Sequence, residues 1–216
     1  MRLVGYNKAA NAAPTLKEVS SMQQRTLVLT LGALAVAINV IAGTVIGNLK
    51  IPFLFLDVIG TIFIAAIYGP YWGALVGLVT NLVLGVTSGY TAIPFAIVNI
   101  IVGLVVGLLA RRNGFRLREA VISGVLLGIL CPSVGTVIAV AVFGGLTGGA
   151  QDVFVLWLKN AGSSLFTSAF LPRLWDNLID KILSTVLVYY VIKGIPQSLL
   201  KRSVPASRSK GGSHAA

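Results

Sequence analysis

Charged residues are what this sequence lacks most. Only 11% of its 216 residues are charged, whereas soluble domains average about 25%. The charge is absent from runs of roughly 20 residues, the length that a helix needs to cross the hydrocarbon core of a bilayer. These runs fill most of the chain and leave no room for a separate soluble catalytic domain. We therefore predict an all-α integral membrane protein.

Residues that build catalytic and metal sites are also scarce. The one cysteine, Cys131, cannot form an internal disulfide and lies in an apolar run, where it fits a small buried hydrophobe. The one histidine, His214, lies near the end of the chain, so no Cys/His metal cluster or Ser/His/Asp set is available. The sequence has no phosphate-binding loop of the G-x-x-x-x-G-K-[ST] type. We expect no enzymatic activity, no cofactor and no metal.

Acidic residues are few, with six Asp and Glu against 17 Lys and Arg and a net charge of +11. In a soluble chain this excess would suggest a nucleic-acid partner. No basic face interleaved with aromatic residues accompanies it, so we expect no nucleic-acid binding. Clustering of Lys and Arg on the cytoplasmic side of a membrane explains the charge better.

Six apolar runs are the predicted transmembrane helices. They cover about residues 25–45, 53–68, 71–86, 94–110, 120–143 and 166–192. A long outer loop, residues 144–164, separates the fifth and sixth and should contain one short helix. The expected organisation is a polar cytoplasmic segment (1–24), a six-helix membrane domain (25–193) and a basic, disordered cytoplasmic tail (194–216).

The basic residues predict the orientation. With the N-terminus inside, the outer loops hold only Lys50 and Lys159, and the inner segments hold thirteen of the 17 Lys and Arg residues. These are Arg2, Lys8, Lys17, Arg25, Arg111, Arg112, Arg116, Arg118, Lys193, Lys201, Arg202, Arg208 and Lys210. Both termini are therefore expected inside, with an even number of spans.

Polar side chains within the predicted spans converge at one depth, in the outer half of the membrane. Such groups are costly in lipid, so their positions indicate function. Four helices contribute amides or carboxylates there, and the inner half has almost nothing comparable. We predict an outward-facing binding pocket formed by Asn39, Asn81, Asn99, Asp176, Asn177 and Asp180. Trp157 and Asn160 of the outer loop are expected to close over it as a lid.

A structural role remains open for each of these residues. A single Asn in a membrane helix often makes only an interhelical hydrogen bond, worth about 0.6 kcal/mol. The sixth span also carries Arg173 and Lys181, so its charged groups could neutralise one another at i+3 and i+4 spacing.

Glycines recur every fourth residue in three of the spans, at Gly69, Gly73 and Gly77, at Gly103 and Gly107, and at Gly124 and Gly128. Such stripes let helices approach closely, so we predict tight packing within the chain. Ala33 and Ala37 form a similar patch near the inner end of the first span, which could instead meet another subunit.

Motifs of the second and third spans point to a family. The run Phe55-Leu56-Asp57-Val58-Ile59-Gly60-Thr61, then Gly69-Pro70-Tyr71-Trp72-Gly73 with Gly77, and then Thr80-Asn81, resembles the substrate-binding S-components of energy-coupling factor (ECF) transporters. The resemblance covers about residues 25–193.

The resemblance implies a subunit that captures a vitamin or a related small organic solute in a bacterial plasma membrane. It also implies partners, namely a transmembrane coupling protein and two ATPases, with Ala33 and Ala37 matching the patch that docks on the coupling protein. The mixed carboxylate and amide lining favours a neutral or zwitterionic heterocycle over a strong anion. The alternatives are a stand-alone secondary carrier, which would need polar groups in both halves, and a ligand-binding membrane sensor.

Overall fold

The computed structural model describes residues 16–49 and 54–196, and every regular element in these two ranges is helical. The all-α prediction is confirmed for this part of the chain. The elements are α1 (Leu16–Leu49), α2 (Ile59–Tyr68), α3 (Pro70–Thr87), a short 3-10 helix η2 (Tyr90–Ala92), α4 (Ala96–Asn113), α5 (Leu117–Phe143), α6 (Asp152–Asn160) and α7 (Leu165–Gly194).

Four of these helices, α1, α3, α4 and α5, are long and apolar enough to cross a membrane. Helix α2 has 10 residues, a length of about 15 Å, which is half of a bilayer core. Helix α7 has 30 residues but contains Arg173, Asp176, Asp180 and Lys181. By length and composition, the described residues therefore contain four candidate spans rather than the six that were predicted.

Two helices differ from their predicted limits. Helix α1 begins at Leu16 rather than near Arg25, so the described part of the expected polar segment continues this helix. The predicted second span, residues 53–68, is helical only from Ile59. Residues 54–58 precede it without regular structure. Residues 1–15 and most of the predicted tail lie outside the described ranges.

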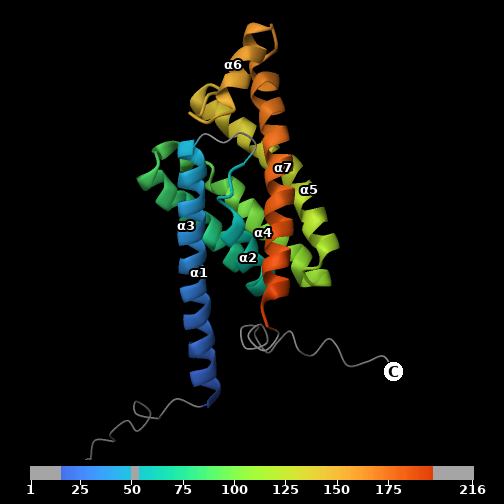
Figure 1. The fold of residues 1–216 in the computed structure, drawn as a ribbon. Helices are drawn as coiled ribbons and strands as arrows, with labels where there is room; N and C mark the ends of the chain where they lie inside the picture. Colours follow the sequence, from blue (N-terminus) through green and yellow to red (C-terminus); the bar gives the residue numbers. More distant parts are fainter. Residues whose placement is uncertain (1–15, 50–53, 197–216) are drawn as a thin grey trace, which may run out of the picture.

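The helices form one bundle with the described chain ends at the same end of it (Figure 1). Helix α5 packs chiefly against α7, and α3 against α4. Helix α2 lies among them and contacts α1, α3, α4 and α7. Helix α6 lies at the opposite end from the chain ends. Residues 54–58 lie beside α1, where Asp57 packs against Gly43, and beside α7, where Asp180 bonds to Phe55 and Leu56.

The glycine stripes are sites of close helix packing, as predicted. A Cβ atom on Gly103 would collide with the backbone of Gly73 and Ala74, and one on Gly77 would collide with the backbone of Asn99. These positions hold α3 against α4. A Cβ atom on Gly124 would lie 2.7 Å from the Cα of Ile182, so this glycine allows α5 to pack closely against α7.

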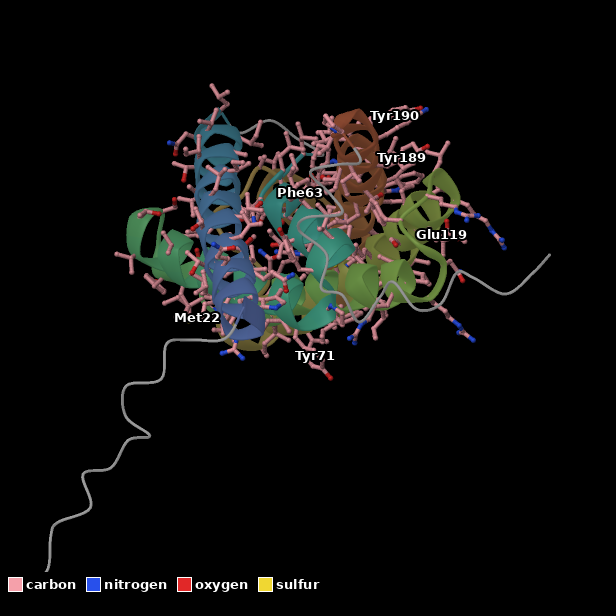
Figure 2. All side chains as sticks on the ribbon, turned by 90° about the horizontal axis from the view of Figure 1, so that it is seen from below. Met22, Phe63, Tyr71, Glu119, Tyr189 and Tyr190 are labelled. Carbon is pink, nitrogen blue, oxygen red and sulfur yellow. The ribbon has the colours of Figure 1, made fainter. Side chains whose placement is uncertain are left out.

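Helix α1 is the least enclosed of the candidate spans. Only 11% of its most apolar window is buried, against 39% in each of the other three. Seen from below, it lies at the edge of the bundle, with Met22 near its lower end (Figure 2). The side of α1 that faces the bundle carries Ala35 and Asn39, which are buried. The opposite side, its outer face, faces away from the bundle; it includes Ala33 and Ala37 and is exposed.

Candidate functional site

A cavity of about 330 Å³ lies inside the bundle. Its wall is formed by the last turns of α1, the 54–58 segment, parts of α3, α4, α5 and α7, and the loop that precedes α6. Small-molecule pockets in proteins measure about 300–1,000 Å³ and combine apolar walls with a few placed polar groups. The cavity is therefore large enough for a small organic ligand.

Its lining combines aromatic and apolar side chains with amides and charges. Phe55 and Phe95 lie in the wall. The polar part holds four amides, Asn81, Asn99, Gln151 and Asn177, and three charged side chains, Asp57, Arg173 and Lys181. Such a lining suits a ligand that has a flat apolar body and a polar edge.

Asn81 and Asn99 form a pair that joins α3 to α4 beside the cavity. The Nδ2 of Asn99 donates to the Oδ1 of Asn81 at 2.8 Å, and the Nδ2 of Asn81 donates to the carbonyl oxygen of Ala92 at 3.0 Å. The Oδ1 of Asn99 has no hydrogen-bond partner among the described residues. Because Gly77 has no side chain, this oxygen has room at the α3–α4 crossing. The pair holds two amides in fixed orientations at the wall.

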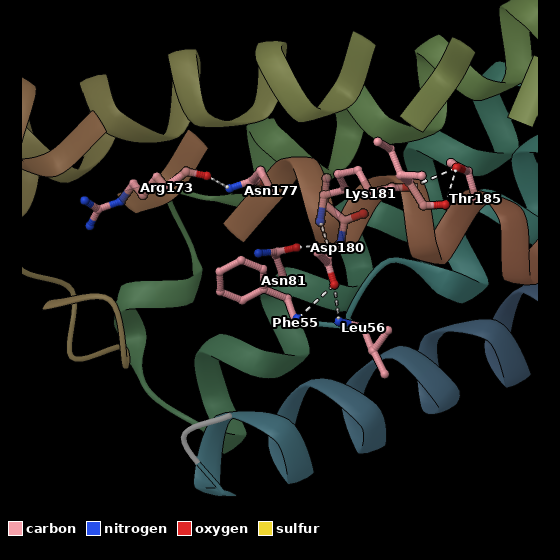
Figure 3. A network of polar contacts seen from close by, with 10 residues as sticks. Phe55, Leu56, Asn81, Arg173, Asn177, Asp180, Lys181 and Thr185 are labelled. Carbon is pink, nitrogen blue, oxygen red and sulfur yellow. Dashed lines mark hydrogen bonds and ion pairs between the residues drawn. The ribbon is translucent and has the colours of Figure 1, made fainter. Parts of the chain in front are cut away.

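The charged residues of α7 are partly paired with each other (Figure 3). The Nζ of Lys181 lies 2.6 Å from the Oδ2 of Asp180, and both side chains are buried. The Oδ1 of Asp180 accepts hydrogen bonds from the backbone N–H groups of Phe55 at 2.8 Å and Leu56 at 3.0 Å. The ammonium of Lys181 also lies 5.7 Å from the ring centroid of Phe55. Asp180 is therefore fully used within the protein, while Lys181 reaches the cavity wall.

Arg173 connects α7 to the loop before α6. Its guanidinium donates to the carbonyl oxygen of Ala169 at 2.8 Å, to that of Gly145 at 3.1 Å and to the hydroxyl of Thr147 at 3.3 Å. The Oδ2 of Asp152 accepts from the N–H of Thr147 at 3.0 Å. Through these bonds, the loop that closes one side of the cavity is fixed to the same helix as Lys181.

Asn39 lies apart from the cavity lining, in contrast to the predicted pocket. Its Nδ2 donates to the hydroxyls of Thr61 at 3.0 Å and Thr80 at 3.1 Å, and its Oδ1 accepts from the N–H of Gly60 at 2.7 Å. The side chain is fully buried. All of these groups belong to α2 and α3, so Asn39 fastens α1 to the bundle and has no spare group for a ligand.

Of the predicted site residues, the structure brings Asn81, Asn99 and Asn177 together in the lining. Asp176 and Asp180 are buried but lie outside it. Trp157 and Asn160 are exposed on α6, and Trp157 is 67% exposed, so neither covers the cavity. The outer loop does contribute to the wall, but through Thr147, Gly149, Ala150 and Gln151.

The prediction of the pocket missed Asp57, Arg173, Lys181 and the two phenylalanines. A signal for the cations was present, since a charge within a membrane helix indicates a functional site by default. Asp57 belongs to the motif that carried the family resemblance, but its place in the wall depends on the non-helical course of residues 54–58.

Among the comparisons with known proteins, a family model matches the chain. No curated protein and no solved structure shows significant similarity to the chain. A sequence profile described as "ECF-type riboflavin transporter, S component" matches residues 22–196, which include all the lining residues of the cavity. The chain therefore belongs to the family of S-components of ECF-type riboflavin transporters and is a transporter subunit rather than an enzyme.

Proposed function

We propose that this protein captures riboflavin, or a vitamin with a similar flat heterocycle, from the outer side of a bacterial plasma membrane. The observation that supports this most is the cavity of about 330 Å³ inside a chain that matches the family over residues 22–196. Its apolar wall, with Phe55 and Phe95, suits the faces of a ring system. Its amides, Asn81 and Asn177 among them, suit a ring edge that carries both donors and acceptors.

The proposed membrane arrangement has six crossings with both termini inside. Helix α7 supports it, because its charged residues are on the buried side while Trp175, Ile179 and Leu183 form an exposed apolar stripe. Helix α2 completes a crossing together with the non-helical segment 54–58. Non-helical backbone at membrane depth is tolerated where it is buried in protein or lines a cavity, and in this segment the N–H groups of Phe55 and Leu56 are bonded to Asp180.

Energy for uptake is proposed to come from a transmembrane coupling protein and two ATPases. The exposed outer face of α1 is the surface proposed to meet the coupling protein, with Ala33 and Ala37 at its centre. Small side chains on a helix let another helix approach closely in lipid. Residues 1–24 and 194–216 are proposed to lie in the cytoplasm.

The test is to purify the protein and to identify its retained small molecules by mass spectrometry, followed by a riboflavin titration that uses quenching of flavin fluorescence. Saturable binding at one site per chain is expected. Because Asp176 is buried on α7 but does not line the cavity, Asp176→Asn is the matched control for Asn177→Leu. The proposal is refuted if wild-type protein binds neither riboflavin nor another heterocyclic vitamin, or if Asn177→Leu and Asn81→Leu both bind as wild type does.

A further inference from the structure

The segment of residues 54–58 supplies Leu54, Phe55, Asp57 and Val58 to the cavity wall without belonging to a helix. Within it, Leu56 has φ of 53°, and no other non-glycine residue in the described ranges has a positive φ. This left-handed conformation is unfavourable for a residue with a Cβ atom. An interaction from outside the segment must therefore hold it in place.

Asp180 provides that interaction. One of its carboxylate oxygens accepts the consecutive N–H groups of Phe55 and Leu56, and the other binds the ammonium of Lys181 (Figure 3). Consecutive N–H groups that converge on one anion form a strong backbone site for it. Asp180 itself is fully buried and lies outside the cavity lining. The Asp180 carboxylate thus binds two parts of the cavity wall at once, the 54–58 segment and the Lys181 side chain.

We propose that Asp180 is a positioning residue for the binding site. It sets the place of the Phe55 ring and of the Lys181 ammonium without touching the ligand. Its effect on ligand affinity rests on the proposed function, whereas its effect on the 54–58 segment does not. In a protein that takes up its ligand from one side, this carboxylate makes the wall of the empty site ready for binding.

The first experiment is amide hydrogen–deuterium exchange of the ligand-free protein, with Lys181→Met compared with the double variant Asp180→Ala/Lys181→Met. The two proteins differ only at Asp180, and neither contains an unpaired buried ammonium. In Lys181→Met, the remaining carboxylate keeps its two backbone N–H donors, Phe55 and Leu56. Exchange in residues 54–58 should be about tenfold faster in the double variant, equivalent to about 1.4 kcal/mol, while α5 and α7 exchange as in Lys181→Met. Equal exchange in the segment for the two variants would overturn the proposal, and so would an increase of the same size throughout the bundle.

The second experiment measures riboflavin binding to the single variants Asp180→Asn and Asp176→Asn. In Asp180→Asn, the oxygen of the new amide still accepts both N–H groups, but its NH₂ group faces the Lys181 ammonium, so Lys181 loses its position. This variant should raise the dissociation rate about tenfold with little change in the association rate, and Asp176→Asn should change neither rate. Equal rates in the two variants would refute the effect on the ligand. If wild-type protein binds no riboflavin, the proposed function fails, and the exchange experiment still decides whether Asp180 holds the segment.

Discussion

Replacing Asn81 by leucine tests the binding site most directly, because Asn81 lines the cavity and also holds Asn99. Leucine has a similar shape but no polar group. The substitution removes the hydrogen bond from Asn99 Nδ2 at 2.8 Å and the one to the Ala92 carbonyl at 3.0 Å. A buried polar group left without its partner costs about 1–3 kcal/mol, so thermal stability should fall by about that amount.

Ligand affinity should fall for a different reason. A ligand edge that faces Asn81 and Asn99 loses one amide and the fixed orientation of the other. With about 0.5–1.5 kcal/mol for each hydrogen bond, two lost contacts amount to about 1–3 kcal/mol, or a rise in Kd of about 5- to 150-fold. Fluorescence titration with riboflavin in detergent measures this change, and thermal unfolding measures stability in the same samples.

The double variant Asn81→Leu/Asn99→Leu separates the two effects. Replacing both partners of a buried hydrogen bond by apolar groups of similar shape is nearly neutral for stability. The double variant should therefore be more stable than Asn81→Leu and bind riboflavin no better. Recovery of affinity together with stability would refute the reasoning, because it would mean that the amides serve only to hold α3 against α4.

Three further predictions concern packing and partners. Gly103→Ala should lower thermal stability by about 1–3 kcal/mol through overpacking, because the new Cβ atom would collide with the backbone of α3. Gly47→Ala is the control and should be neutral, because no atom lies within 4 Å of its Cβ position. Asn39→Leu should lower the free energy of unfolding by at least about 2 kcal/mol, because it leaves three buried partners unsatisfied. Unchanged stability in thermal unfolding would contradict the inference that Asn39 holds α1 against α2 and α3. Ala33→Trp/Ala37→Trp should abolish copurification with the coupling protein and ATPases while riboflavin binding by the isolated protein stays unchanged, and an intact complex would argue against this surface.

Hydrophobicity and breaking residues were enough to locate α3, α4, α5 and α7 within a few residues. Gly69 and Pro70 mark the sharp turn between α2 and α3, and the structure has that turn at the same place, with φ of 102° at Gly69. These elements follow from local properties, since an apolar run of sufficient length has few alternatives to a helix in a membrane. The glycine stripes predicted close packing within the chain, and the structure shows which helices they join, α3 with α4 and α5 with α7.

The course of residues 54–58 could not be predicted in that way. Their apolar character continues into α2, and an apolar run gives no sign that its first turn is missing. The contact that holds this segment lies far away in the sequence, at Asp180, whose carboxylate accepts the N–H groups of Phe55 and Leu56. A tertiary contact of this kind overrides local preference and cannot be read from either segment alone.

Tertiary contacts also decide which of the predicted pocket residues line the cavity. Asn81, Asn99 and Asn177 do line one cavity, but an expected depth along a helix does not say which way a side chain faces. Asn39 lies between α2 and α3, where Thr61 and Thr80 use both of its donors. Asp180 and Lys181 are neighbours on α7, but the Asp180 carboxylate binds backbone N–H groups of the 54–58 segment, whereas Lys181 lines the cavity. In this bundle, polar residues at one depth therefore divide into those that build the wall and those that line it. Substitutions should follow this division, with losses at Asn39 appearing in stability and losses at Asn81 appearing in affinity as well.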